Sequence, residues 1–142
     1  MSTSPLNVLF VCTHNSARSI LAEGLMNHLG AGRFRGFSAG SCPSGRVNPL
    51  ALATLESLGV STTGMHSKSW NTFTGPDAPR LDLVITVCDA AANESCPVLP
   101  GSPATVHWGC ADPSAIDGDV EAQRGAFAET ARLISDRIQR LL

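Results

Sequence analysis

The chain has 142 residues, of which 43% are apolar and 15% are charged. This size and composition suit one globular domain over 1–142 and are too small for two ordinary domains. The net charge of −2 comes from mixed signs without a long basic run, which argues against nucleic-acid and membrane-surface partners. The opening MSTSPLN has no basic segment, and no apolar run reaches the length of a signal or membrane-spanning sequence. We therefore expect a cytoplasmic protein.

Apolar patterns at the start of the chain predict a strand, a loop and a helix. The β-branched, apolar run over 8–11 predicts the first strand. Apolar residues at helical spacing over about 16–29 predict a helix that ends before Gly30. A weaker alternating pattern over 33–38 predicts the second strand.

A second helix is predicted to begin at Pro49, with Asn48 as its N-cap and Gly59 at its C-terminal end. The residues that we expect to face inward are Leu50, Ala53, Leu55 and Leu58.

Two further strands and a long helix complete the pattern. The continuous apolar run over 83–87 is typical of a parallel strand covered on both faces, and 105–108 predicts a short fourth strand. Apolar residues at helical spacing mark the last helix: Phe127, Ala131, Ile134, Ile138 and Leu141. The alternation predicts an α/β fold, a four-stranded parallel sheet with helices on both faces and the flavodoxin-like order 2-1-3-4.

The chain contains an odd number of cysteines: Cys12, Cys42, Cys88, Cys96 and Cys110. In a cytoplasmic chain that is long enough to fold without cross-links, they favour thiol chemistry over a disulfide framework. We expect Cys42 and Cys110 to be bystanders.

Cys12 ends the first predicted strand, at the sheet edge where α/β proteins bind ligands. If the next loop wraps into the helix, its amides converge on one point and the helix dipole adds positive potential, which suits a tetrahedral oxyanion. The residues expected to form this cradle are Thr13, His14, Asn15, Ser16, Ala17 and Arg18. Arg18 would hold two oxygens of the anion and favour the thiolate of Cys12.

Two other side chains are expected to support this nucleophile. Ser19 would donate a hydrogen bond to the thiolate, and the side-chain amide of Asn15 would hold the shape of the loop. The alternative is that Cys12 is a buried structural residue.

Asp112 and Pro113 follow the fourth predicted strand and so return to the same edge as Cys12. A carboxyl group beside an anion is favoured in its protonated form, which suits a general acid for a departing oxygen. The alternative is a plain Asp-Pro turn.

The third predicted strand ends at Cys88, beside the first strand, and Cys96 follows eight residues later. A Cys88 thiol would attack an adduct on Cys12, and Cys96 would resolve the resulting disulfide by exchange. The segment between them would have to unwind or shift. A zinc site of Cys88, Cys96, His107 and Cys110 lacks the paired short spacings of structural zinc.

Three segments together resemble arsenate reductases of the low-molecular-weight tyrosine phosphatase superfamily, those typically coupled to thioredoxin. They are CTHNSARS from Cys12 to Ser19, VITVC…ESC ending at Cys96, and Asp112-Pro113. The resemblance implies that Cys12 attacks arsenate, Asp112 protonates the departing oxygen, Cys88 displaces arsenite and Cys96 completes a redox-active disulfide relay. It also implies a role in arsenical resistance.

The resemblance leaves the cofactor and the electron donor open. Some members bind potassium beside the anion loop, and Asn15, Glu23 and Ser38 match that site in type. No tightly bound cofactor is otherwise implied. The donor is thioredoxin or, in another branch, glutaredoxin with glutathione.

Two other functions compete with arsenate reduction. A low-molecular-weight tyrosine phosphatase would use the same cradle, but Ser114 and Ala115 follow the Asp-Pro pair and the chain has no Tyr. A non-catalytic thiol redox sensor would use the same cysteines without turnover.

Overall fold

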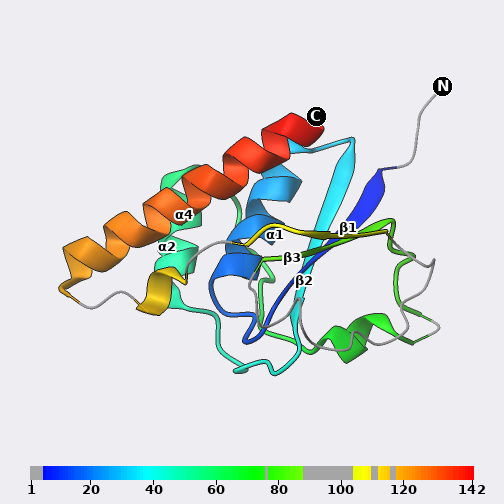
Figure 1. Cartoon of the computed structure of the whole chain (residues 1–142), viewed down its shortest axis with the longest axis horizontal. Coiled ribbons are helices and arrows are strands. Elements are labelled where there is room, and N and C mark those ends of the chain that lie inside the picture. Colours follow the sequence, from blue (N-terminus) through cyan, green and yellow to red (C-terminus); the bar gives the residue numbers. More distant parts are fainter. Residues whose placement is uncertain (1–4, 76, 88–103, 110–111, 116–117) are drawn as a thin grey trace.

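The computed structural model describes residues 5–75, 77–87, 104–109, 112–115 and 118–142 (Figure 1). Within them one sheet contains the strands β1 (Leu6–Cys12), β2 (Phe34–Gly40), β3 (Leu83–Thr86) and β4 (Ala104–His107). The helices described are α1 (Arg18–Leu29), α2 (Pro49–Ser57) and α4 (Val120–Leu141), with the short 3-10 helices η1 (Trp70–Phe73) and η2 (Pro113–Ala115). The strands pair in parallel in the order β2-β1-β3-β4. The predicted α/β class and strand order are therefore confirmed.

Strand β1 lies inside the sheet and is buried on both faces. Residues 8–11 are at most 1% exposed, as the continuous apolar run predicts. Cys12 pairs with Gly40 of β2, and Val11 pairs with Thr86 of β3. The carboxyl end of β1 thus lies between the ends of two neighbouring strands, where α/β sheets place ligands.

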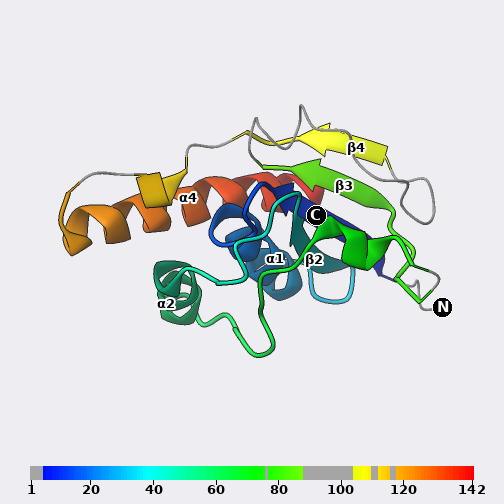
Figure 2. The same cartoon turned by 90° about the horizontal axis from the view of Figure 1, so that it is seen from below.

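Helices cover both faces of the sheet. Helix α1 contacts β1 and β2 and packs against α2 and α4 (Figure 2). Along β2, Ser38 bonds to Glu23 of α1, whereas the ring of Phe37 meets that of Phe73 in η1. Because successive residues of a strand point to opposite faces, η1 lies on the face away from α1. Among the described residues, the α-helices gather on one face and a 3-10 helix lies on the other.

Helix α2 begins as predicted but turns a different face inward. Asn48 caps it by accepting a hydrogen bond from the amide of Leu50 at 2.9 Å. Ala53 and Leu58 are exposed, so the prediction that they face inward was wrong. The docking of α2 against both α1 and α4 fixes which face is covered. The buried residues of α2 are Ala51 and Leu55.

Helix α4 buries the stripe that its spacing predicts. The residues at most 2% exposed are Phe127, Ala131, Ile134 and Ile138, and Leu141 packs against them. In the part of the chain that the structure describes, no helix is both long and apolar enough to cross a bilayer.

Candidate active site

The loop between β1 and α1 wraps around the sulfur of Cys12. Its carbonyl oxygens accept hydrogen bonds from the segment 41–48 that joins β2 to α2: Ser41 N–H to Cys12, Cys42 N–H to Thr13, Ser44 N–H to His14 and Asn48 N–H to Ser16. In a trans peptide the N–H points opposite to the carbonyl, so amides of this loop face its interior. The amide of Asn15 shows this direction, because it donates to Cys12 Sγ at 3.2 Å. The loop has the arrangement that an anion cradle requires.

Asn15 and Ser19 form a series of hydrogen bonds that ends at the Cys12 sulfur. Asn15 Oδ1 accepts from the backbone N–H of Lys68 at 2.9 Å, so Asn15 Nδ2 is the atom that donates to Ser19 Oγ at 2.7 Å. Ser19 Oγ lies 2.9 Å from Cys12 Sγ. The thiolate form of Cys12 has no hydrogen, so in that form the Ser19 hydroxyl is the donor to the sulfur. Among the described residues, a Cys12 thiolate accepts hydrogen bonds from the Ser19 hydroxyl and from the Asn15 amide.

Asn15 is held in an uncommon backbone conformation. It is fully buried and has a φ of 49°, in the left-handed region that Asn adopts more readily than most residues. The close approach of Gly40 supports this geometry, since a Cβ there would lie 2.5 Å from Thr13 O and 3.0 Å from Asn15 N. The absence of a side chain at Gly40 lets β2 pack directly against the loop.

Helix α1 begins at this loop without a side-chain cap. Its N-cap residue is Ala17, and its first turn contains no acidic residue. The first amides of a helix lack intrahelical partners and carry the positive end of the dipole. Arg18 is the first helical residue, and its guanidinium adds a fork suited to two oxygens of an anion.

Asp112, which follows β4, lies close to Arg18 at the start of α1. Asp112 Oδ2 lies 3.8 Å from Arg18 Nη2, and the Asp112 side chain is 34% exposed. Its Oδ1 accepts from the amide of Ser114 at 2.9 Å and from the Ser114 hydroxyl at 2.7 Å. The Asp-Pro turn and the acid role therefore do not exclude each other, because the turn holds the carboxyl toward the nucleophile loop.

These groups line one small pocket. Its cavity volume is about 30 Å³, which is space for two or three water-sized groups and is the scale of a small oxyanion. Its lining residues are Cys12, His14, Ser16, Ala17, Arg18, Asp112 and Ser114. Cys12 is 3% exposed, but its sulfur has polar neighbours and lines this pocket, which argues against a purely structural cysteine.

Glu23 and Ser38, two of the residues predicted to bind potassium, form a group with Lys68. The backbone of Lys68 connects this group to Asn15 of the nucleophile loop. Ser38 Oγ donates to Glu23 Oε1 at 2.5 Å, and Lys68 Nζ lies 3.6 Å from the same carboxylate oxygen. The Lys68 and Glu23 side chains are 14% and 16% exposed. Burial lowers the pKa of Lys68, and Glu23 opposes this effect through its charge and hydrogen bond. The ion pair is thus largely removed from water.

The structure brings together Cys12, Asn15, Arg18, Ser19 and Asp112, as the sequence predicts. Cys88, Cys96 and Cys110 lie outside the described residues, as does the segment predicted to unwind.

Gly40, Ser114 and Lys68 are described residues at the site that had no predicted role. Ser114 has a local signal, since a serine two residues after an Asp commonly bonds back to it. Lys68 has none, because its partners Asn15 and Ser38 lie 53 and 30 residues away.

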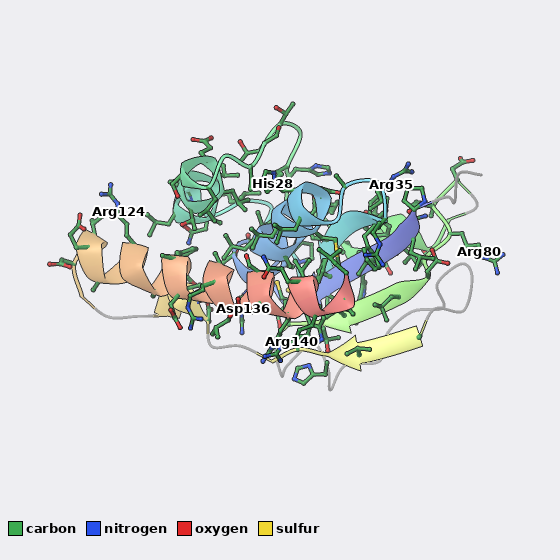
Figure 3. The ribbon with its side chains drawn as sticks, turned by 90° about the horizontal axis from the view of Figure 1, so that it is seen from above. His28, Arg35, Arg80, Arg124, Asp136 and Arg140 are labelled. Carbon is green, nitrogen blue, oxygen red and sulfur yellow. The ribbon has the colours of Figure 1, made fainter. Side chains whose placement is uncertain are left out.

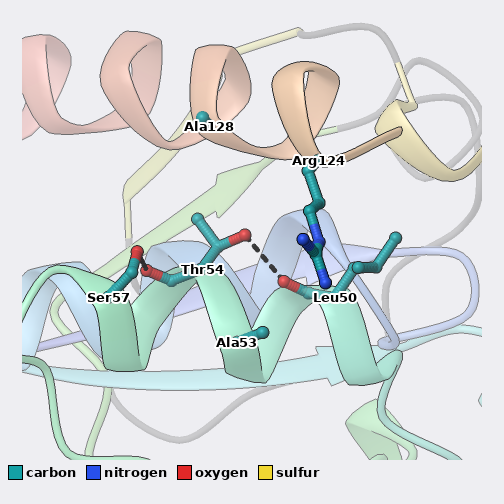
Figure 4. A pocket seen from close by; sticks show the side chains of 6 residues that line it. All are labelled: Leu50, Ala53, Thr54, Ser57, Arg124 and Ala128. Atoms are coloured by element: carbon teal, nitrogen blue, oxygen red, sulfur yellow. Dashed lines mark hydrogen bonds between the residues drawn. The ribbon is translucent and has the colours of Figure 1, made fainter. Parts of the chain in front are cut away.

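A larger pocket of about 370 Å³ lies between α2 and α4 (Figure 4). Its polar side chains are already used locally, since Thr54 Oγ1 donates to Leu50 O and Ser57 Oγ to Thr54 O. Arg124 also lines this pocket, and Arg80 lies near the opposite end of the molecule (Figure 3). The described residues that line it include no cysteine, histidine or carboxylate, so the Cys12 pocket is the better candidate for reactive chemistry.

The chain is similar in sequence and structure to proteins of one family. A model of the low molecular weight phosphotyrosine protein phosphatase family matches residues 7–142. An arsenate reductase of Halalkalibacterium halodurans is 33% identical over 93% of this chain and 91% of its own length. A glutaredoxin arsenate reductase of Synechocystis is 40% identical over 61% of this chain and 63% of its own. The solved structure of an arsenate reductase in the phosphate binding state has a TM-score of 0.75 and 29% identity, covering 96% of this chain and 95% of that one.

Proposed function

Because the chain belongs to the low molecular weight phosphotyrosine protein phosphatase family and is similar over its length to arsenate reductases, we propose that it reduces arsenate to arsenite. The observation that carries this proposal is the position of the Cys12 sulfur, which lies within hydrogen-bond distance of the Ser19 hydroxyl and the Asn15 amide, beside an uncapped helix N-terminus. Cys12 shares one pocket with Arg18 and Asp112. The reduction supports a role in arsenic detoxification.

In the first step, Cys12 attacks the arsenic atom of arsenate. A sulfur–arsenic bond forms and one arsenic–oxygen bond breaks. Asp112 gives a proton to the departing oxygen, which leaves as water. Arg18 and the loop amides bind the remaining oxygens, so the negative charge stays compensated as the bonds change.

In the second step, the Cys88 thiolate attacks the Cys12 sulfur. A disulfide bond forms, the sulfur–arsenic bond breaks, and its electron pair stays on arsenic, which leaves as arsenite. Cys96 then attacks Cys88, which frees Cys12 and leaves a Cys88–Cys96 disulfide. An external dithiol supplies two electrons and two protons to restore both thiols. The amide of Val87, one residue before Cys88, donates to Val11 O at 2.9 Å, which supports an approach of Cys88 to Cys12.

The second candidate is phosphomonoester hydrolysis, which the family match favours. It would need Cys12, Arg18 and Asp112 without the relay cysteines. The small pocket, with Ser114 in its lining, favours a bare oxyanion over a phosphorylated tyrosine ring. A thiol sensor without turnover is the third candidate.

The test measures arsenate-dependent NADPH oxidation, first with thioredoxin and its reductase and then with glutaredoxin, glutathione and glutathione reductase. We expect turnover with thioredoxin, the donor that the motif resemblance implies. The name of the Synechocystis relative makes glutaredoxin the necessary comparison. If neither donor supports arsenate-dependent oxidation while an aryl phosphate is hydrolysed, the chain is a phosphatase. If neither substrate turns over, the sensor is favoured.

A Cys96→Ser variant tests the relay separately. It should release arsenite once per molecule and then stop, because the Cys12–Cys88 disulfide has no resolving thiol. Full steady-state activity with thioredoxin would reject the relay. Cys42→Ser is the matched control, because Cys42 is exposed and forms no disulfide. This variant should keep wild-type turnover.

A further inference from the structure

Lys68 is the one lysine in the chain, which also has nine arginines and four histidines. Its side chain lies in the largely buried group formed with Glu23 and Ser38. Lysine is a compact point charge with three N–H donors, whereas arginine is a planar fork. The position therefore carries the type of cation that most closely imitates a monovalent metal ion.

The ammonium of Lys68 is surrounded by oxygen atoms. Lys68 Nζ donates to His66 O at 2.9 Å and to Ser38 Oγ at 3.5 Å, and Glu23 Oε1 lies 3.6 Å away. Three oxygens thus surround a group with three donors. These oxygens belong to α1, to β2 and to the segment before η1. The ammonium therefore contacts three separate parts of the fold.

The backbone of the same residue reaches the nucleophile. The Lys68 amide donates to Asn15 Oδ1, and its carbonyl accepts from the Gly40 amide at 2.9 Å. Asn15 in turn orients Ser19, whose hydroxyl meets Cys12 Sγ. Holding Lys68 in place therefore holds the donors of the Cys12 sulfur in place.

The residues present do not fit a potassium ion. Asn15 Oδ1 is used by the Lys68 amide, and the Glu23 and Ser38 oxygens face the ammonium. A potassium ion among these oxygens would lie within a few ångströms of a like charge, in a site shielded from water. The Glu23 carboxylate still needs a cation, because an uncompensated buried charge is strongly unfavourable.

We propose that the Lys68 ammonium takes the place of a monovalent metal ion and is a positioning residue that orders the donors to Cys12. The proposal rests on the proposed function only in treating Cys12 as the nucleophile. It predicts that potassium does not change the reactivity of Cys12 in the wild-type protein. Once the ammonium is removed, full reactivity of Cys12 should require potassium.

Two variants separate the charge from the space it fills. Lys68→Ala removes the charge and opens room among the oxygens, whereas Lys68→Met removes the charge but fills the room with an apolar stem. Both keep the backbone amide that bonds to Asn15. Each protein is reduced and treated with iodoacetamide at pH 7 in potassium chloride or in choline chloride of equal ionic strength.

Alkylation is followed by mass spectrometry after trypsin digestion. Cleavage after Arg18 gives peptide 1–18, in which Cys12 is the single cysteine, and peptide 36–46 carries the exposed Cys42 as an internal control. Thermal unfolding in the two salts is measured in parallel. Neither readout needs arsenate or an electron donor, so the result stands whether or not the chain reduces arsenate.

We expect wild-type Cys12 to react at one rate in both salts. In Lys68→Ala the rate should fall about fivefold in choline, the effect of about one lost hydrogen bond, and recover in potassium, with a higher Tm. In Lys68→Met it should stay low in both salts. Cys42 should not change. A potassium effect on the wild-type protein, wild-type rates for both variants in choline, or no recovery of Lys68→Ala would overturn the proposal.

Discussion

The nucleophile Cys12 and the acid Asp112 line the same small pocket but are held in different ways. Cys12 is almost fully buried, and its loop is fixed by Asn15, by Gly40 and by hydrogen bonds from the segments 41–48 and 67–68. Asp112 is one-third exposed and is held by its own turn through Ser114 and by a 3.8 Å approach to Arg18. The donors around the sulfur are organised before substrate arrives, whereas the acid keeps contact with water, its source of protons.

The largest expected effect comes from removing either reactive group. Cys12→Ser should lower arsenate turnover by at least about 10⁴-fold, because a serine hydroxyl can neither form the disulfide nor carry the electrons. Asp112→Asn should lower turnover by about 10²–10⁴-fold, the usual contribution of a general acid. Arsenite release measures both.

The thermal stability of the Asp112→Asn variant shows how firmly the carboxyl group is held. Asp112→Asn should leave Tm within about 3 °C of wild type, since the carboxyl is partly exposed and an amide oxygen still accepts from Ser114. A large drop in Tm for Asp112→Asn would mean that the acid side is as rigidly built as the nucleophile side.

Asn15→Ala tests the rigid side directly. The change removes two side-chain hydrogen bonds, to Lys68 and Ser19, and places Ala at a φ of 49°. We expect a loss of about 2–4 kcal/mol in the free energy of unfolding, measured by urea denaturation, together with slower alkylation of Cys12. The matched control is Asn27→Ala, which also loses two side-chain hydrogen bonds, both to Gly36. It should be destabilised without a change at Cys12.

Gly40→Ala tests the packing of β2 against the loop. A Cβ at this position would meet Thr13 O at 2.5 Å, so the loop must shift. We expect a cost of about 1–3 kcal/mol in stability and a fall of about tenfold in kcat/KM, since small displacements of a cradle are costly. Gly75→Ala is the control, because a Cβ there meets nothing within 4 Å. Equal activity of the two variants would show that the loop tolerates displacement.

The local part of the site could be predicted from the sequence because its residues are close together in the chain. Cys12, Arg18 and Ser19 lie within eight residues at a strand–loop–helix junction, where strand polarity and helix dipole already define an anion site. Asp112 could be placed because parallel strands end at the same edge.

The contacts that support the site could not be predicted in this way. Lys68 reaches Asn15 across 53 residues, and no periodicity in the sequence relates them. The exposed Ala53 of α2 and Leu58, the C-cap of α2, show the same limit, since the docking of α2 against α1 and α4 decides which apolar residues are covered. Local patterns predict elements and motifs, whereas tertiary packing decides which side chains support them.

The smallest expected effect concerns the contact between α4 and Gly109, which lies between β4 and Asp112 in the chain. Arg137 of α4 donates to Gly109 O at 3.2 Å, a contact three residues before Asp112. Arg137→Met keeps most of the side chain's apolar stem and removes the donor, so Asp112 should be less well positioned and turnover should fall about threefold.

Arg132→Met is the control on the same helix, since Arg132 pairs with Glu129 and Asp136 in solvent, where ion pairs contribute little. Turnover should stay at the wild-type value in this control. Equal turnover of both variants would show that the Asp112 turn holds its position without help from α4, and the acid side would then be more self-sufficient than its exposure suggests.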